Sequence, residues 1–190
     1  EEKRSSSALL DDGRIEELTS GRDRGAGIRV VVGESTGFAH TSDLSEAGLI
    51  AAAETAASAA RGSGTGTTIV DLDRVNAPRP NLVRIMPGDV PKAKKVELLL
   101  MANEMARAEG AAITQVSARY ADSHRRILVA NTDGTLGTDE QVKTLFSISA
   151  VASGDTGMQT GRESIGRSVG FELFDTYEVG DLARTAAQRA

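Results

Sequence analysis

Residues 153–174, SGDTGMQTGRESIGRSVGFELF, are the most informative stretch of the chain. This polar run between two apolar segments contains five glycines: Gly154, Gly157, Gly161, Gly166 and Gly170. Glycine allows close backbone approach and positive φ, and binding residues concentrate in loops held by a rigid sheet. We therefore predict that residues 154–164 form a loop inserted between strands. The alternative is a purely structural loop that packs on another domain.

Two Asp-Gly pairs, at 12–13 and 133–134, predict the turns of antiparallel hairpins, because this pair readily takes positive φ. Residues 36–41 and 169–173 each read as a strand with a Gly-Phe pair, and each precedes an alanine-rich helix. We interpret this pattern as a weak duplication of a β-meander plus helix; independent use of common strand-edge residues is the alternative. The expected fold class is α+β, a mainly antiparallel sheet built from two meander-plus-helix units, with alanine-rich helices packed on one face.

The chain of 190 residues is long enough for a substantial core. We predict a single α+β domain over residues 1–190. Its expected parts are a first meander plus helix at 1–61, a glycine- and proline-rich connector at 62–91, a helix at 92–110 and a second meander plus helix at 111–190. The chain opens without an initiator methionine and ends inside a helical pattern without a stop signal, so we expect part of a longer protein.

The composition excludes several functional classes. A net charge of −5 argues against a general nucleic-acid binder, which needs a basic surface to displace counterions from phosphates. The absence of cysteine excludes disulfides and thiolate metal sites within these residues. No run approaches the roughly 18 apolar residues of a membrane span, and the first residues do not resemble a signal peptide. We therefore expect a cytoplasmic location and neither a nucleic-acid nor a membrane partner.

Residues suited to catalysis are sparse. His40 and His124 are the only histidines, and they are far from the one-turn spacing of two metal ligands on a helix. Ser123 and His124 are sequence neighbours, which rarely gives the geometry of a nucleophile and its base. The run Gly161–Gly166 has P-loop spacing but lacks the lysine that should follow it. We predict no catalytic residue, no metal ligand and no bound cofactor in this chain.

Several long strings resemble the TldD/PmbA family of metallopeptidases, once called modulators of DNA gyrase. They are LLDDGRIEELTSGRDRGAGIRVVV and GFAHTSDLS near the start, DVPKAKKVELL in the middle, and YADSHRRILVANTDGTL, GMQTGRES and GFELFDTYEV toward the end. The late strings are most similar to the TldD branch. The resemblance implies a cytoplasmic zinc-type peptidase of unstructured or modified peptides, assembled as a homodimer or as a heterodimer with a PmbA-like subunit. In that family a C-terminal region carries the metal on a His-Glu-x-x-x-His helix, and no such string occurs here.

We therefore expect the N-terminal, non-catalytic portion of such a peptidase, without its catalytic C-terminal region and inactive alone, which shapes substrate access and dimer assembly. The expected substrate-channel residues are Met158, Gln159, Thr160, Arg162 and Glu163, because they combine an adaptable apolar side chain with opposite charges. Two alternatives stay open. One is a stand-alone binding or regulatory module of the gyrase-modulator type, and the other is a purely structural dimerisation domain.

Overall fold

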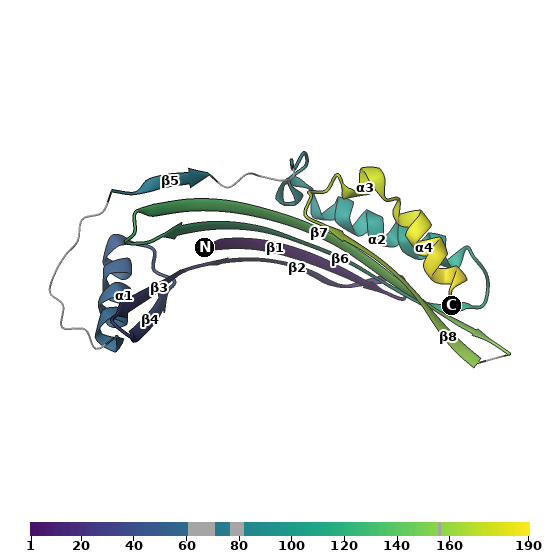
Figure 1. Ribbon diagram of the computed structural model, residues 1–190. Coiled ribbons are helices and arrows are strands. Elements are labelled where there is room, and N and C mark those ends of the chain that lie inside the picture. The colour runs from purple at the N-terminus through teal and green to yellow at the C-terminus, as the bar shows by residue number, and fades with distance from the viewer. Residues whose placement is uncertain (61–70, 77–81, 156) are drawn as a thin grey trace. The chain divides into compact units, whose positions relative to one another are not determined.

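A computed structural model describes residues 1–60, 71–76, 82–155 and 157–190 (Figure 1). The strands are β1 (Glu2–Asp11), β2 (Arg14–Arg24), β3 (Ala26–Val32), β4 (Ser35–Thr41), β5 (Asp73–Asn76), β6 (Ile113–Ala130), β7 (Thr135–Gly154) and β8 (Gly157–Arg167). The helices are α1 (Glu46–Ala59), α2 (Lys92–Arg107), α3 (Leu173–Thr176) and α4 (Val179–Gln188), with a 3₁₀ turn, η1, at Pro87–Asp89. This combination of a mainly antiparallel sheet with helices confirms the α+β class.

The six-stranded sheet has the order β2-β1-β6-β7-β5, and β8 also pairs with β7. Strands β3 and β4 form a separate two-stranded sheet. The chain divides into two compact units, which are described separately below. The first unit comprises Glu1–Lys3, Arg22–Ala77 and Arg126–Asp139, and the second comprises Arg4–Gly21, Pro78–Arg125 and Glu140–Ala190.

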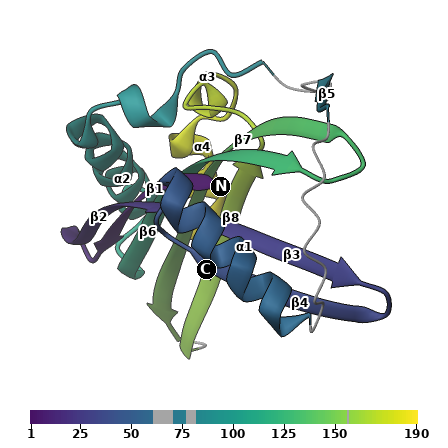
Figure 2. The same ribbon diagram turned by 90° about the vertical axis from the view of Figure 1, so that its left-hand side faces the viewer.

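In the first unit, α1 lies along the β3–β4 hairpin (Figure 2). A Cβ atom on Gly37 would lie 1.9 Å from the carbonyl oxygen of Ala56, so the absence of a side chain lets the helix approach the strand closely. Strand β5 pairs in parallel with Thr135–Thr138 of β7. Much of the predicted connector, residues 62–70 and 77–81, lies outside the described residues.

In the second unit, α2 and α4 cover one face of the sheet (Figure 1). Alternate residues of the central strands point into this core, as expected for strands with one covered face. The fully buried side chains include Leu10, Leu99, Val116, Tyr120, Phe146, Ala150, Ala183 and Ala186. Both predicted Asp-Gly turns are confirmed. Asp12 and Gly13 have φ of 48° and 81°, and Gly134 has φ of 89°.

The predicted strand at 169–173 is wrong, because this segment turns and enters α3. The Phe171 amide donates to the carbonyl of Ile85 at 2.8 Å, and a Cβ on Gly170 would lie 2.1 Å from the same oxygen. The buried Glu172 carboxylate accepts the backbone N–H groups of Arg84, Ile85 and Gly170 at 2.9–3.1 Å. Burial alone would raise the pKa of Glu172, but these hydrogen bonds hold it below its usual value. The segment therefore anchors the chain that leads into η1.

The predicted loop at 154–164 is also wrong. Almost all of it continues β7 into a long antiparallel hairpin with β8, in register from Gly154 opposite Gly157 to Thr144 opposite Arg167. Glycine is unfavourable in a strand interior, but it permits close approach by another element. Gly161 has this role, since a Cβ there would lie 1.9 Å from the carbonyl oxygen of Ala186 in α4. Packing against the helix therefore outweighs the local preference of these residues for a loop.

Candidate functional site

The five residues expected to line a substrate channel lie on opposite faces of β8, because successive side chains of a strand alternate. Met158, Thr160 and Arg162 are exposed on the face away from the helices. Gln159 and Glu163 share the helix-facing side with Gly161, whose missing side chain accommodates α4. The strand therefore separates the two charges that the sequence placed together.

The Glu163 side chain forms an ion pair with Arg189. Its carboxylate accepts a short hydrogen bond from the guanidinium of Arg189, just beyond the end of α4. The same guanidinium lies 3.4 Å from the carbonyl oxygen of Arg162. Glu163 thus connects the end of α4 to β8, while Gln159 lines a second, smaller pocket of about 310 Å³ beside α4.

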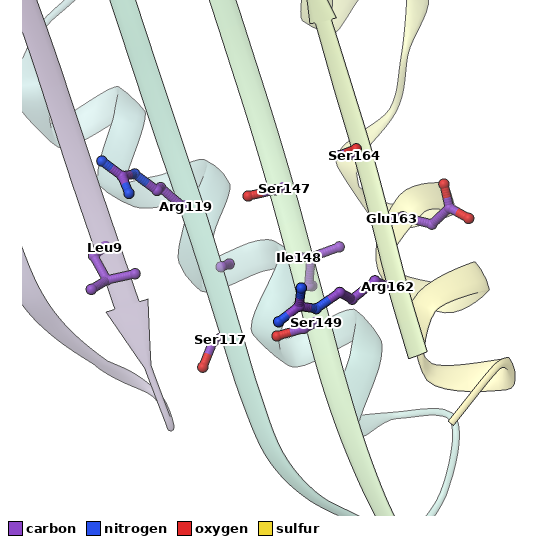
Figure 3. A pocket seen from close by; sticks show the side chains of 10 residues that line it. Leu9, Ser117, Arg119, Ser147, Ile148, Ser149, Arg162, Glu163 and Ser164 are labelled. Carbon is purple, nitrogen blue, oxygen red and sulfur yellow. The ribbon is translucent and has the colours of Figure 1, made fainter. Parts of the chain in front are cut away.

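The open face of the sheet carries a pocket of about 470 Å³ (Figure 3). Arg162 of β8 lies directly opposite Ser149 of β7, and Ser164 lies opposite Ser147. Arg119 lines the pocket from β6 on the other side of β7. Besides these residues, the lining includes Leu9, Ser117, Ala118, Ile148 and Glu163. The pocket thus brings two guanidinium groups and several hydroxyls over three adjacent strands.

Hydroxyls at the pocket differ in their partners. Ser117 donates a short hydrogen bond to the carboxylate of Asp11, which also accepts from Gln115 Nε2 at 3.1 Å. The hydrogen bond from Ser117, and to a smaller extent that from Gln115, lowers the pKa of Asp11. Ser147 and Ser149 form no side-chain hydrogen bond with other residues that the structure describes. They therefore present free donors and acceptors to the pocket.

Of the pocket residues, only Arg162 and Glu163 were expected from the sequence. Arg119, Ser117, Ser147, Ser149 and Ser164 were missed. The sequence pattern that could have identified them is a small polar or charged residue at every second position. These residues alternate with Val116, Ala118, Phe146, Ile148 and Ile165. That alternation predicts a polar sheet face, but only strand pairing shows which polar residues become neighbours.

A buried polar cluster lies on the covered side of the same unit. Lys95 Nζ in α2 is 2.7 Å from Asp122 Oδ2 and 2.8 Å from Ser6 Oγ, and the lysine and aspartate side chains are only 5% and 7% exposed. The ammonium also lies 5.1 Å from the ring centre of Tyr120. Burial, reinforced by the charge of Asp122, strongly raises the pKa of Tyr120. The Lys95 contacts with Ser6 and Asp122 fix α2 against β1 and β6, although the buried Tyr120 hydroxyl has no hydrogen-bond partner among the described residues.

The described residues do not provide a metal centre. No group of three or more His, Cys, Asp or Glu side chains suited to a metal ion occurs among residues 1–60, 71–76, 82–155 and 157–190. His124 Nε2 lies 2.7 Å from Glu140 Oε1, and this pair falls short of the three side chains required for such a group. His40 belongs to the other unit, where it stacks on Phe38. In the same described residues, no helix is long and apolar enough to cross a membrane.

Two protein-family models match the chain. The PmbA/TldA metallopeptidase central domain matches residues 85–190, and PmbA/TldA metallopeptidase domain 1 matches residues 1–60. A metalloprotease of Methanothermobacter thermautotrophicus is 35% identical over 98% of this chain and 40% of its own length. A metalloprotease TldD homolog of Haemophilus influenzae is 32% identical over 92% of this chain and 36% of its own length. The chain thus spans about two fifths of the length of the curated relatives it matches.

Solved structures show the same fold. A Thermotoga maritima protein described as a modulator of a DNA gyrase superposes with a TM-score of 0.82 at 17% identity, covering 100% of this chain and 42% of that one. TldE from Thermococcus kodakarensis gives a TM-score of 0.75 at 16% identity, covering 98% and 42%. At such low identity these similarities concern the fold alone. The family models cover most of the chain, and the chain belongs to the TldD/PmbA family of metallopeptidases.

Proposed function

We propose that this chain is the substrate-admitting, non-catalytic portion of a metal-dependent peptidase that cleaves unstructured or modified peptides. The observation that carries the proposal is the family match over residues 85–190, together with relatives named metalloproteases that are more than twice as long as this chain. The metal implied by those names finds no set of ligands among the described residues. Zinc is the metal that we expect, and a single N-terminal α+β domain remains our prediction for residues 1–190.

The role of the present residues is to receive the peptide. The open sheet face offers arginine and serine side chains without local partners, whereas the other face is filled by α2 and α4. Of the five predicted channel residues, Met158, Thr160 and Arg162 face the open side and stay candidates for peptide contact. Gln159 and Glu163 lie on the helix side, so we assign Glu163 to the attachment of α4.

The test uses the complete protein that contains these residues. Turnover of an unstructured peptide should require a divalent metal and stop on chelation. Arg162→Ala should lower turnover without changing the metal content, and Thr41→Ala, at a residue of the first unit that does not line the pocket, serves as a control. The 190 residues alone should bind no stoichiometric metal and cleave nothing. Peptide cleavage by these residues alone, in a metal-dependent manner, would refute the proposed division of roles.

Assembly into a homodimer, or into a heterodimer with a PmbA-like subunit, is part of the proposal. Its support is the exposed apolar surface of the first unit, where Val31 and Phe38 are 58% and 62% exposed. Sedimentation of the complete protein over a range of concentrations, alone and with a PmbA-like subunit, tests this point. A monomer under all these conditions contradicts it. A purely structural dimerisation domain predicts the same dimer but no effect of Arg162→Ala on turnover.

A second candidate is a regulatory module that binds DNA gyrase, and we expect the cytoplasm as the location for either function. Its support is the description of the Thermotoga maritima structure as a modulator of a DNA gyrase. Gyrase binding by the complete protein that persists at moderate salt, with no metal-dependent turnover of any peptide, would favour this candidate over the peptidase.

A further inference from the structure

We propose that the pocket over β6, β7 and β8 binds the acidic side chains of an extended peptide, with Arg119 and Arg162 as the carboxylate-binding residues. The proposal rests on the proposed peptidase function and adds a preference for substrates that carry Asp or Glu. Both arginines line the pocket and lie within the second unit.

The pocket carries positive charge that no described side chain pairs with. The side chains of Arg119 and Arg162 form no ion pair or hydrogen bond with any other residue that the structure describes. Glu163 is the one acidic residue of the pocket lining, and its carboxylate is bonded to Arg189. The pocket is therefore locally cationic on a chain whose net charge is −5. A guanidinium binds a carboxylate through paired N–H donors, which makes carboxylate a fitting ligand.

The neighbouring Asp11 is not paired with these arginines. Its carboxylate lies outside the pocket lining and accepts hydrogen bonds from Ser117 and Gln115. Those bonds lower the pKa of Asp11, so it is charged at neutral pH and engaged with its own donors. A ligand carboxylate would therefore compete with no carboxylate already bound to Arg119 or Arg162.

The two arginines lie far enough apart to contact different side chains of one extended peptide. Arg119 and Arg162 lie on strands separated by β7, and neighbouring strands are about 4.8 Å apart, so their backbones are roughly 10 Å apart. Figure 3 shows the Arg162 side chain lying across β7, while the Arg119 side chain points from β6 toward β1. In an extended peptide, residues i and i+2 project to one side about 6.8 Å apart. Two carboxylates on one extended peptide can each engage one guanidinium, whereas a single terminal carboxylate would engage only one.

The pocket surface beside the arginines consists largely of small serine residues. Ser147 and Ser149 on β7 and Ser164 on β8 are small and leave the sheet surface accessible to a flat, extended chain. Hydroxyl groups both donate and accept hydrogen bonds, so they satisfy peptide N–H and C=O groups without selecting a side chain. The selection then comes from the two arginines, and it acts on charge.

The experiment measures binding of a fluorescent peptide with glutamate at positions i and i+2 to the metal-free complete protein. Without metal, binding is observed separately from cleavage. Arg119→Gln and Arg162→Gln should each weaken binding about tenfold, as expected for one charge-assisted contact. Arg29→Gln is the matched control, because Arg29 is an exposed strand arginine in the first unit. It should leave the affinity unchanged.

Changes to the peptide complete the test. Replacing both glutamates by glutamine should weaken binding to the wild type but not to the Arg119→Gln/Arg162→Gln variant, while amidation of the peptide C-terminus should have no effect. Equal binding of the glutamate and glutamine peptides would overturn the proposal, as would loss of binding on amidation alone. Displacement of the peptide by inorganic phosphate at low millimolar concentration would indicate a general anion site and also overturn it.

These outcomes separate the inference from the proposed function. Metal-dependent cleavage of a neutral peptide, with no arginine-dependent preference for glutamate, refutes the inference and leaves the peptidase function intact. Arginine-dependent binding of the glutamate peptide, with no cleavage of any peptide by the metal-loaded protein, supports the pocket and refutes the peptidase function.

Discussion

Gly161→Ala should strongly destabilise the second unit, because the new methyl group has no room. The added Cβ would lie 1.9 Å from the carbonyl oxygen of Ala186 and 2.7 Å from the amide nitrogen of Ala190. Ordinary contacts begin near 3.4 Å, so α4 would have to move by about 1.5 Å. Overpacking of this kind costs about 1–3 kcal/mol and occasionally more. We expect about 3 kcal/mol, since both obstructing atoms belong to backbone.

Gly166→Ala is the matched control on the same strand. Its added Cβ would lie 3.5 Å from the nearest atom, Leu145 Cδ1, which is an ordinary contact. Here the smaller entropy of the unfolded chain should make the change neutral or stabilising by about 0.5 kcal/mol. The two variants should therefore differ by about 3 kcal/mol, or by roughly 6–12 °C in melting temperature for a chain of this size.

Two measurements check this prediction. Urea denaturation followed by circular dichroism gives the difference in the free energy of unfolding between the two variants. Hydrogen exchange localises the effect, which should appear first in α4 amides and leave β3 and β4 of the other unit unchanged. If Gly161→Ala unfolds within about 0.5 kcal/mol of Gly166→Ala, α4 does not approach β8 as described and the reasoning fails.

Three further predictions concern other contacts. Lys95→Met should lower the free energy of unfolding by about 3–5 kcal/mol in a denaturation experiment, because it leaves the buried Asp122 carboxylate unpaired. Combining Lys95→Met with Asp122→Leu should recover most of that loss, and a double variant as unstable as the single one contradicts this. The folded-state pKa of Glu172 is lowered, so its stabilisation is present above the unfolded pKa of about 4.3 and is lost as the pH falls through the folded pKa. Glu172→Gln should thus lower stability at pH 7 by about 2 kcal/mol and flatten the acid dependence of urea unfolding, and an unchanged acid profile would argue against it. Gly37→Ala should accelerate hydrogen exchange in α1, since its Cβ would lie 1.9 Å from the Ala56 carbonyl oxygen, and unchanged exchange would show that α1 tolerates the methyl group.

Local signals in the sequence were sufficient for much of the fold. The Asp12-Gly13 turn follows from the positive φ that this pair tolerates, and the structure gives φ of 48° and 81° there. The helix predicted at 92–110 matches α2 to within a few residues, and the alanine-rich helices predicted after the two Gly-Phe segments correspond to α1 and α4. These features depend on near neighbours in the chain, which a sequence displays directly.

Features that depend on distant neighbours were predicted poorly. The strand at Gly157–Arg167 has the composition of a loop, and only its pairing with β7 and its contact with α4 make it a strand. The pocket was missed for a related reason. Arg119 and Arg162 are far apart in sequence, and they line one pocket only because β6, β7 and β8 are adjacent in the sheet.

The two units share a packing arrangement that the predicted duplication aligned incorrectly. In each unit, a glycine in the second strand of a hairpin lies under an alanine-rich helix. A Cβ on Gly37 would lie 1.9 Å from a helix carbonyl and 2.6 Å from the amide four residues later, and the values for Gly161 are 1.9 Å and 2.7 Å. Gly161, and not Gly170, is therefore the counterpart of Gly37. The Gly-Phe resemblance that suggested the duplication paired a strand with a turn.

This arrangement also determines which charge reaches the pocket. Because only Gly161 permits the close approach of α4, it must face the helix, and alternation then turns Arg162 to the open face. A shift of one residue in the β7–β8 register would exchange the two faces. Arg162 would lie under the helix and the Glu163 carboxylate would turn to the open face, which would reverse the charge presented there. A residue selected for backbone packing thus fixes the electrostatics of the opposite face, and Gly161→Ala should weaken binding of the glutamate peptide although Gly161 does not line the pocket.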